Sequence, residues 1–461
     1  MTFPSAEPHP AADLELVGPW MMRQRWFANK GTLPRLEEIG RWELPGDTRT
    51  RFVTHLILDH APGGATLYQV PLSYRAEPLG TTAPLGRQGV AWVYDAPHDG
   101  GYVAALLRML AGGTGAAGTG VAARGDRNPA SVLFDADSPA LHSRVLSGEQ
   151  SNTSIIVEWP GTDSVPVICK LFRALHHGDN PDVELQGALA AAGSTAVPRA
   201  VGAVVAEWPD TGRTGGRAHG HLAFAQEFLP GAVDAWRLAL ESASAGADFV
   251  EPARRLGVTT AEVHAMLASA LPTRPATDDD IAETLGQMHG RLDMALREVP
   301  ELEVHRTALE ETLALARTST WPAQQRIHGD LHLGQVLDVP DRGWFVVDFE
   351  GEPLRPMAER SRLDSPLRDV AGMLRSFDYV AGALGVTAGV DAREWARASR
   401  RAFTEGYSAT SGTNLAECRA VLDAFEADKA LYEAVYEVRN RPEWLAIPVA
   451  ALERISARVP G

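Results

Sequence analysis

The alternation of apolar and polar residues predicts β-strands early in the chain. Residues 51–59 (RFVTHLILD) and 65–74 (ATLYQVPLSY) alternate with a period of two, and the turn residues 62–64 (PGG) separate them. The pair therefore predicts an antiparallel hairpin. Residues 102–110 are typical of a helix. The Gly-rich segment 111–120 that follows predicts a loop or linker, and we expect a domain boundary near it.

A second group of strands is expected further along the chain. The predicted strands are 154–159, 165–172, 201–207 and 221–228. A helix is expected to open at Asn180-Pro181-Asp182, where proline suits the first turn and Asp182 could cap it. Beyond Pro230 the pattern is mainly helical, except for residues 326–352. This order predicts an α+β fold with a sheet-rich part followed by a mostly helical part, an order that several folds share.

Composition limits the partners and the compartment. The 461 residues are 45% hydrophobic and 22% charged, as in globular proteins, and the formal net charge is -16. An acidic chain does not favour nucleic acid or anionic membrane surfaces as partners. The two distant cysteines, Cys169 and Cys418, fit a reducing cytoplasm. We see no signal peptide and no apolar run that would span a membrane. The oligomeric state does not follow from the sequence, and a monomer is slightly favoured.

The strongest local signal for chemistry lies in residues 327–337 (IHGDLHLGQVL) and 344–353 (WFVVDFEGEP). Phosphoryl transfer needs a carboxylate that orients the attacking hydroxyl and accepts its proton, and oxygen ligands that hold Mg²⁺. Asp330, in a tight loop, suits the first role. Asp348 and the amide oxygen of Gln335 suit the second. The alternative is that both aspartates only cap turns, but both flank apolar strands, as a catalytic loop and its hairpin would.

The sequence HGDLHLGQ followed by DFEGEP resembles the aminoglycoside-phosphotransferase-like kinases, although Gln335 stands where that family usually has Asn. Four further segments resemble the maltokinases and their relatives: RQRWF at 23–27, EQSNTS at 149–154, DSPLRDVAGMLRSF at 364–377 and DKALYE at 428–433. The resemblance implies a protein-kinase-like bilobal fold with ATP and Mg²⁺ as cofactors. It also implies three parts: an N-terminal cap domain at 1–125, a small, intermediate lobe that binds the ATP phosphates at 126–229, and a mostly helical C-lobe at 230–461.

The resemblance also implies roles for residues of the small lobe. Lys170 is expected to pair with the α/β-phosphates, and Glu184 to be its ion-pair partner. The turn that covers the phosphates is expected at Ser151, Asn152 and Thr153. The hinge whose backbone binds adenine is expected at Gln226, Glu227 and Leu229. An ordinary surface charge is the alternative for Lys170 and Glu184, but a lysine within an apolar strand needs a partner if it is buried.

The acceptor site is implied by the position of the sugar in maltokinases, between the catalytic loop and the C-terminal helices. The matching residues here are His332, Arg368, Asp369, Asp428, Tyr432, Glu433, Tyr436, Glu437 and Trp444. On a helix, residues spaced by four share a face, so this segment can present carboxylates and aromatic rings to a hydroxyl-rich ring. The alternative is salt bridging along a solvated helix, for example between Lys429 and Glu433.

The identity of the acceptor rests on finer resemblances. Residues 23–31, 92–99, 169–171 and 221–236 look more like the maltokinase-related glucosamine kinases, which implies transfer to the 6-hydroxyl of D-glucosamine with Asp330 as base. A protonated amine would favour a carboxylate-lined pocket, which Asp428, Glu433 and Glu437 could supply. A maltokinase that forms maltose 1-phosphate, an aminoglycoside phosphotransferase and a non-catalytic sugar- or nucleotide-binding regulator remain as alternatives. The presence of Lys170, Asp330 and Asp348 argues against the regulator.

Overall fold

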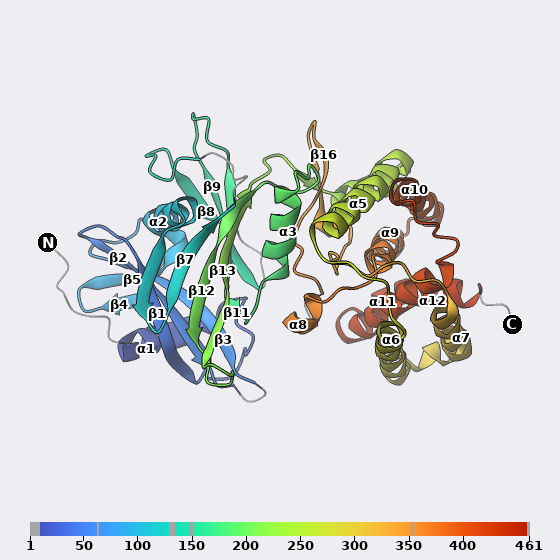
Figure 1. Cartoon of the computed structure of the whole chain (residues 1–461), viewed down its shortest axis with the longest axis horizontal. Coiled ribbons are helices and arrows are strands. Elements are labelled where there is room, and N and C mark those ends of the chain that lie inside the picture. Colours follow the sequence, from blue (N-terminus) through green and yellow to red (C-terminus); the bar gives the residue numbers. More distant parts are fainter. Residues whose placement is uncertain (1–9, 62–63, 129–133, 147–150, 353–354, 459–461) are drawn as a thin grey trace. The chain divides into compact units, whose positions relative to one another are not determined.

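The computed structural model describes residues 10–61, 64–128, 134–146, 151–352 and 355–458. The chain divides into two compact units (Figure 1). The first comprises Met1–Ala191 and Pro198–Pro230, and the second comprises Ala192–Val197 and Gly231–Gly461. The expected boundary at 229/230 falls one residue from this division. The expected boundary at 125/126 falls inside a strand, β7 (Ala122–Arg127), so the expected cap and small lobe lie in one unit.

An antiparallel sheet forms the first unit, with strand order β4-β5-β3-β2-β1-β6-β7-β12-β13-β10-β9-β8 and β11 paired to β3. Besides β7, its strands are β1 Leu36–Leu44, β2 Thr50–Asp59, β3 Thr66–Arg75, β4 Gly86–Gln88, β5 Ala91–Asp95, β6 Gly115–Thr119, β8 His142–Val145, β9 Asn152–Glu158, β10 Val167–Phe172, β11 Ala174–Leu175, β12 Ala200–Pro209 and β13 Arg217–Glu227. The hairpin expected at 51–59 and 65–74 is confirmed, because β2 and β3 pair antiparallel from Thr50–Arg75 to Asp59–Thr66.

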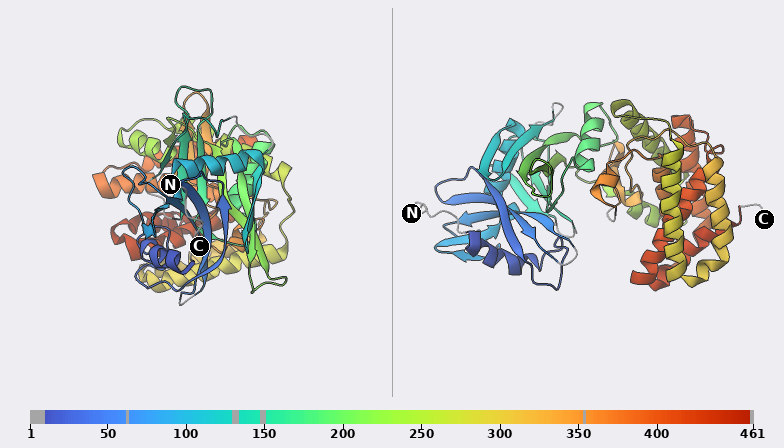
Figure 2. Two further views of the ribbon diagram at one scale, coloured as in Figure 1. Left: turned by 90° about the vertical axis from the view of Figure 1, so that its left-hand side faces the viewer. Right: turned by 60° about the horizontal axis from the view of Figure 1, so that its bottom comes forward.

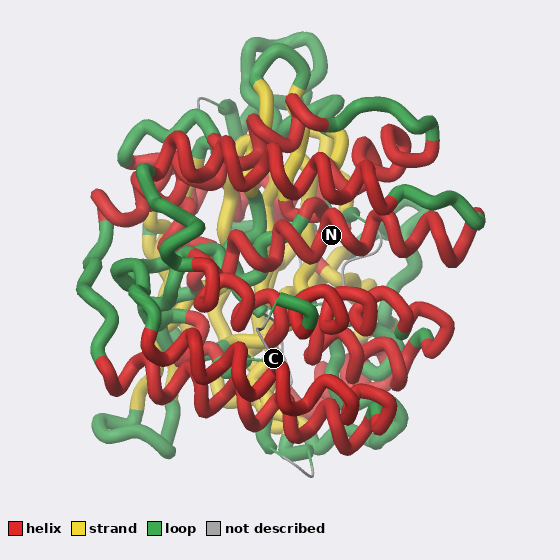
Figure 3. The backbone as a smooth tube through the Cα atoms, turned by 90° about the vertical axis from the view of Figure 1, so that its right-hand side faces the viewer, coloured by secondary structure: helices red, strands yellow, loops and turns green. Residues whose placement is uncertain are grey.

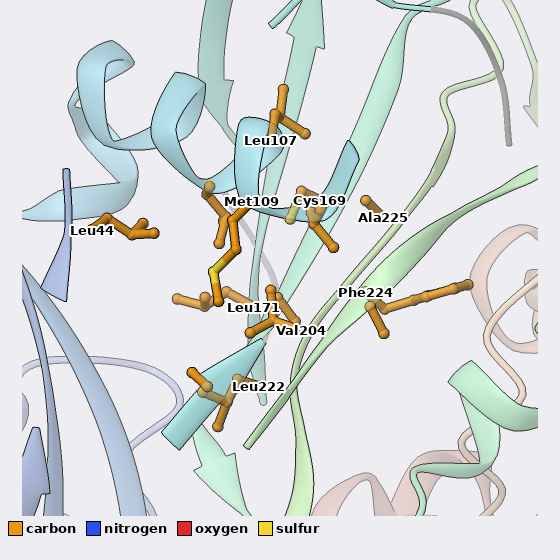
Figure 4. Close-up of a cluster of buried hydrophobic side chains, with 14 of the residues drawn as sticks. Leu44, Leu107, Met109, Cys169, Leu171, Val204, Leu222, Phe224 and Ala225 are labelled. Atoms are coloured by element: carbon orange, nitrogen blue, oxygen red, sulfur yellow. The ribbon is translucent and has the colours of Figure 1, made fainter. Parts of the chain in front are cut away.

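Three helices accompany this sheet: α1 (Pro10–Met21), α2 (Gly100–Gly112) and α3 (Pro181–Ala191). Helix α1 lies beside the cap strands (Figure 2, right), where it contacts β1 and β4. Helix α2 packs over β7 and β12, and its Leu107 and Met109 enter the core with Cys169 and Leu171 (Figure 4). Burial raises the pKa of Cys169 to about 12, so this thiol stays protonated at neutral pH.

The expectation of a loop at 111–120 is wrong for residues 115–119, which form strand β6. Strand β6 pairs with β1 through Trp42 and Gly118, and with β7. A Cβ atom at Gly118 would lie 1.9 Å from the carbonyl oxygen of Arg41. The glycines that indicated a loop therefore permit a close backbone approach within the sheet.

The second unit is mainly helical, as expected (Figure 3, red). Its helices are α4 Ala235–Ser244, α5 Val250–Ala270, α6 Asp278–Glu298, α7 Arg306–Thr318, α8 Met357–Arg360, α9 Leu367–Ala388, α10 Arg393–Ser411, α11 Arg419–Asn440 and α12 Ala446–Ser456. A small sheet orders its strands β14 (Val233–Asp234), β15 (Val336–Val339) and β16 (Gly343–Val346) side by side. Among the described residues, no helix is long and apolar enough to span a bilayer.

Candidate active site

Asp369, in the first turn of α9, holds the loop that precedes β15 by two backbone hydrogen bonds. Its Oδ2 accepts the N–H of His328 (2.9 Å) and its Oδ1 accepts the N–H of Gly329 (2.8 Å). His264 Nε2 lies 2.9 Å from the same Oδ2. Burial works against the ionised carboxylate, but His264, together with His328 and the N–H of Gly329, outweighs it and lowers the pKa of Asp369. The structure thus gives Asp369 a positioning role beneath the loop instead of the expected sugar contact, because its two oxygens are buried and already bonded.

The loop is also bonded to itself and to the hairpin that follows it. The N–H of Asp330 donates to Nδ1 of His328 (3.3 Å), and Nε2 of His328 donates to the carbonyl of Val347 (3.0 Å). Gly329 adopts a left-handed φ of 83°, which glycine accepts without strain. A Cβ atom at Gly372 of α9 would lie 2.5 Å from the carbonyl oxygen of Leu331, so the loop requires this glycine to pack on the helix. The carboxylate of Asp330 is therefore presented from a fixed backbone.

A lysine from α11 binds this carboxylate. Lys429 Nζ lies 3.0 Å from Asp330 Oδ1 and 3.6 Å from Glu352 Oε1. Burial works against the charge of Asp330, but Lys429, together with His332 and His328, outweighs it and holds the pKa of Asp330 below its usual value. Burial likewise works against the ammonium of Lys429, and the two carboxylates outweigh it and raise the pKa of Lys429. Asp330 is consequently ionised at neutral pH.

Asp330 lines a small recess of about 20 Å³ in the second unit, which is partly open to solvent. The other lining residues are Arg291, Gly329, Leu331, Glu352, Arg368, Gly372, Phe425, Asp428, Lys429 and Tyr432. Arg291 Nε lies 2.6 Å from Asp428 Oδ1, and the guanidinium of Arg368 lies 4.9 Å from the ring centroid of Phe425. Three carboxylates and three cations thus face one recess together with two aromatic rings. This arrangement can hydrogen-bond hydroxyls and stack against the face of a sugar ring.

The structure brings three of the expected sugar residues to this recess: Arg368, Asp428 and Tyr432. His332 follows the lining residue Leu331 in the sequence but is not itself among the residues that line the recess. Its Nδ1 accepts the N–H of Gly334 (3.0 Å), and burial lowers the pKa of His332.

The remaining expected sugar residues on α11 and after it lie elsewhere. Glu433 is buried against Arg375, with both nitrogen distances at 2.9 Å or less. Glu437 accepts from Tyr379 (3.0 Å) and pairs with Arg441. Tyr436, 45% exposed, and Trp444 both lie under the guanidinium of Arg441. The reason is geometric: Asp428 and Tyr432 share one face of α11, whereas Glu433 and Glu437 point from another face toward α9. The carboxylate cluster expected from Asp428, Glu433 and Glu437 is therefore not formed.

Sequence reasoning missed the charged recess residues Arg291, Glu352 and Lys429, the last as the partner of Asp330, and also the ring of Phe425. Glu352 belongs to the DFEGEP segment but was given no role. A compositional signal existed for Lys429, because the chain has only three lysines among its 43 basic residues. Arg291, on α6, has no motif around it and could be found only from the fold.

The expected metal ligands lie together. Gln335 Nε2 donates to Asp348 Oδ2 (3.0 Å), and the backbone N–H of Val347 donates to the carbonyl of Gln335 (3.0 Å). Asp348 has a left-handed φ of 67°, which is costly for a residue other than glycine and is common at functional sites. The amide oxygen of Gln335 and the carboxylate of Asp348 are hard oxygen donors, which fit Mg²⁺. Pro353 of the DFEGEP segment lies outside the described residues.

In the first unit, Lys170 on β10 has a partner that the sequence did not indicate. Lys170 Nζ lies 2.9 Å from Asp182 Oδ2, and Asp182 is buried in the first turn of α3. Asn180, rather than Asp182, caps this helix, because its Oδ1 accepts the N–H of Asp182 (2.9 Å). Glu184 is half-buried one turn into the same helix, and its pairing with Lys170 stays a prediction.

The expected phosphate turn leads into β9. Ser151 is exposed, Asn152 is the first residue of β9, and the buried Thr153 accepts a hydrogen bond from Arg173 Nε at 2.8 Å. Glu149 and Gln150, which belong to the motif quoted for this turn, lie outside the described residues.

The expected hinge follows β13. Gln226 and Glu227 end that strand, and the side chain of Glu227 pairs with Arg199 at 3.0 Å. The N–H of Glu227 donates to the carbonyl of Arg199, and the N–H of Phe228 donates to that of Pro166, both at 2.8 Å. These two N–H groups are committed, so an adenine contact here would come from carbonyl groups of the segment or from Leu229.

Comparisons with known proteins identify two matching family profiles and several similar kinases. The profile of the maltokinase N-terminal cap domain matches residues 20–99, and that of the phosphotransferase enzyme family matches residues 142–403. A glucosamine kinase of Streptacidiphilus jiangxiensis is 30% identical over 448 residues, which cover 91% of this chain and 94% of that protein. A glucosamine kinase of Mycolicibacterium smegmatis is 30% identical over 353 residues, covering 70% of this chain and 81% of that protein.

A solved structure of a glucosamine kinase in complex with glucosamine, ADP and inorganic phosphate is also similar. It covers 98% of this chain and all of that chain, with a TM-score of 0.67 and 24% identity. At this identity the likeness shows a shared fold.

Proposed function

Because the chain belongs to the phosphotransferase enzyme family, we propose that it transfers the γ-phosphate of ATP to the 6-hydroxyl of D-glucosamine. The observation that carries this proposal is the position of Asp330, an ionised carboxylate on the wall of a polar recess that also presents Glu352, Asp428 and Tyr432. The choice of acceptor is supported by the two glucosamine kinases that are 30% identical to this chain.

Asp330 orients the acceptor hydroxyl and takes its proton as the oxygen attacks phosphorus. A carboxylate with a lowered pKa is a weak base, so it accepts the proton late, once the hydroxyl has become acidic through bonding to the phosphoryl group. Lys429 fixes the carboxylate, and Asp369 fixes the backbone that carries it. The rate then comes from positioning rather than from a covalent intermediate.

The nucleotide-binding groups follow from the same proposal. Gln335 and Asp348 would hold Mg²⁺, which neutralises charge on the phosphates when bound. Lys170, itself held by Asp182, would pair with the α/β-phosphates. Each of these side chains is anchored by a hydrogen bond or ion pair before any ligand binds, which lowers the entropic cost of binding.

Recognition of the amine in glucosamine would fall to Glu352. Asp428 already bonds Arg291 at 2.6 Å, whereas the distance from Glu352 to Lys429 is 3.6 Å. Glu352 is also buried, so a charge-assisted hydrogen bond to it is shielded from water. The aromatic ring of Tyr432 would stack on the apolar face of the sugar.

A maltokinase activity that forms maltose 1-phosphate is the second candidate. Two observations favour it. The N-terminal cap profile that matches residues 20–99 is that of maltokinases. The recess also balances three carboxylates with three cations, so it carries no excess negative charge that would select an ammonium over a hydroxyl.

The test is ADP production with Mg²⁺-ATP and four acceptors in parallel: glucosamine, glucose, maltose and an aminoglycoside. N-acetylglucosamine serves as the matched control, because it keeps the ring and loses the positive charge. We expect the highest kcat/KM with glucosamine, and a ³¹P NMR signal of a 6-phosphate. Preference for maltose with an anomeric phosphate would replace the first candidate by the second. Preference for the aminoglycoside would identify a resistance kinase, and no turnover with any acceptor would favour a non-catalytic regulator.

A further inference from the structure

Arg173 is fully buried in the first unit. Nη2 lies 2.9 and 2.7 Å from the two oxygens of Asp95, and Nε donates to Thr153 Oγ1 at 2.8 Å. The guanidinium also lies over two indole rings, 5.0 Å from the centroid of Trp26 and 5.9 Å from that of Trp20. One side chain therefore connects four residues of three separate segments.

The contacts of Arg173 join the cap segment to the strands expected to hold phosphate. Asp95 ends β5, and both Asp95 and Trp26 lie within the cap match at 20–99. Thr153, the last residue of the expected phosphate turn, lies on β9 and pairs in register with Leu171 of β10. Lys170 precedes Leu171 on that strand, and Arg173 follows the strand's last residue. Arg173 thus lies where β10, the strand that carries Lys170, and the expected phosphate turn meet the cap segment.

A second set of bonds joins the same elements through the backbone. Gln69 of β3, within the cap, donates its N–H to the carbonyl of Arg173 (2.9 Å). Its side-chain Nε2 donates to the carbonyl of Phe172 (2.6 Å) and to that of Leu222. Strand β11 then pairs with β3. The end of β10 is therefore fixed to the cap segment by backbone hydrogen bonds as well as by the side chain of Arg173.

Stability alone does not account for this arginine. Removing a guanidinium from water costs several kcal/mol, and buried ion pairs often add little net stability. Nη1 of Arg173 is buried without a hydrogen-bond partner among the described residues, which adds to the cost. What the arrangement does provide is orientation, because a bidentate contact and a third hydrogen bond fix the plane of the guanidinium and the position of Thr153.

We propose that Arg173 is a positioning residue through which the cap segment fixes the phosphate turn at Ser151–Thr153 next to Lys170. The hydroxyl of Thr153 is then the contact by which the cap holds the turn, and not a nucleotide ligand. Ser151 and Asn152 remain to meet the phosphates. This inference rests on the proposed function, since it needs a nucleotide at the turn.

The test uses two conservative variants, Thr153→Val and Asp95→Asn, in the full chain. Each removes one contact of Arg173 and nearly preserves side-chain volume. The readouts are the Kd for Mg²⁺-ADP by calorimetry, the KM for ATP and for the sugar, kcat, and the Tm. Thr162→Val is the matched control, because the hydroxyl of Thr162 bonds within the turn after β9, where it donates to the carbonyl of Trp159 (2.9 Å) and accepts the N–H of Ser164 (3.2 Å).

We expect the Kd for Mg²⁺-ADP and the KM for ATP to rise at least fivefold in both variants, with the KM for the sugar changed less than twofold. Wild-type ADP affinity in both variants would overturn the inference and leave the proposed function intact. A parallel loss of Tm and of both KM values would also overturn it, because a merely structural role gives that result. Should Asp95→Asn fail to fold, Thr153→Val decides, since it leaves the Arg173–Asp95 pair in place. Failure of the parent protein to bind Mg²⁺-ADP would overturn the proposed function and this inference together.

Discussion

The ammonium of Lys429 lies 3.0 Å from Oδ1 of Asp330, and the two groups are largely shielded from solvent. Asp330 belongs to the loop that Asp369 of α9 fixes, and Lys429 lies in the middle of α11. The position of the carboxylate therefore depends on two helices. Burial alone would raise the pKa of Asp330, and the lysine is the first cause that reverses it. Lys429 is therefore the largest of the causes that keep the proposed base ionised.

Replacing Lys429 by Met is expected to change the pH dependence of the reaction. Without the ammonium, burial has less opposing it and the pKa of Asp330 rises, so the acid limb of the kcat profile moves to higher pH. Activity then falls more at pH 6 than at pH 8. Arg439→Met, on the same helix but in an exposed pair with Glu298, should leave the profile unchanged. Superimposable acid limbs for Lys429→Met and the parent would contradict this account.

Asp330→Asn is expected to lower kcat by about 10²–10⁴, because the amide orients the hydroxyl but takes no proton. The affinity for Mg²⁺-ADP should stay within twofold. Asp341→Asn is the matched control, since Asp341 is exposed in the turn of the same hairpin with a φ of 60°, a conformation that Asn also adopts. The measurement is ADP release under saturating acceptor. Activity of Asp330→Asn close to that of the parent would exclude Asp330 as the base.

Sequence reasoning found the residues whose chemistry is rare and whose spacing is local. Asp330, Gln335 and Asp348 lie within 19 residues of one another, and the structure places Gln335 beside Asp348. The partner of Asp330 could not be found in this way, because Lys429 lies 99 residues away and its contact exists only through the packing of α11. The sequence analysis assigned Asp369 to the sugar site because it belongs to the motif at 364–377. Its role in holding the N–H groups of His328 and Gly329 depends instead on the tertiary position of α9.

The fold shows the same division. Strands with clear alternation, such as β2 and β3, were predicted with nearly correct ends. Strand β6 was missed because its glycines indicate a loop locally, and only the approach of β1 explains them. On α11, a period of four groups residues by face, but the period carries no information on which face meets the loop. Glu433 and Glu437 were expected in the recess for that reason and face Arg375 and Tyr379 instead.

Chelation of divalent metal is expected to abolish ADP production, and Asp348→Asn to raise the Mg²⁺ concentration needed for half-maximal activity at least tenfold. The cause is the loss of one charged oxygen ligand, while Asn still tolerates the left-handed φ of residue 348. Asp338→Asn, on β15 of the same hairpin, is the control. The measurement is activity against Mg²⁺ at fixed ATP. Full activity of the parent with excess chelator would show that no metal is needed.

Asp13→Asn is expected to stabilise the first unit at neutral pH, by up to about 1 kcal/mol. Asp13 is buried beside His55, and burial, only partly offset by His55, raises the pKa of Asp13. The folded state therefore disfavours the ionised form, so this group makes the parent less stable as pH rises through that pKa. The gain from the variant should shrink when the pH is lowered and Asp13 becomes protonated.

The matched control for that variant is Asp47→Asn, measured by thermal unfolding over the same pH range. A backbone hydrogen bond from Arg49 is the main cause that lowers the pKa of Asp47, so its ionised form favours folding. Its removal should act in the opposite direction and lose its effect at acid pH. Equal shifts in Tm for both variants would show that net charge, rather than local environment, controls the stability.

Glu426→Gln is expected to destabilise the second unit by about 3 kcal/mol, because it leaves buried arginines without their anion. Glu426 is fully buried, with Arg400 Nη2 at 2.6 Å and Arg454 Nη2 at 3.4 Å. Burial works against its charge, but Arg400, Arg454 and Arg419 together outweigh burial and lower the pKa of Glu426 to about 2. Because the pKa of Glu426 is lower in the folded state, its charge stabilises the fold at pH values above the unfolded pKa near 4.5, and this contribution is lost as pH falls toward 2.

The difference in unfolding free energy between the parent and Glu426→Gln, measured in urea, should therefore be largest near neutral pH and become smaller below pH 4. Glu394→Gln, from an exposed pair with Arg397, should cost less than about 1 kcal/mol at any pH. A difference for Glu426→Gln that stays constant down to pH 3 would mean that the arginines are satisfied without its charge.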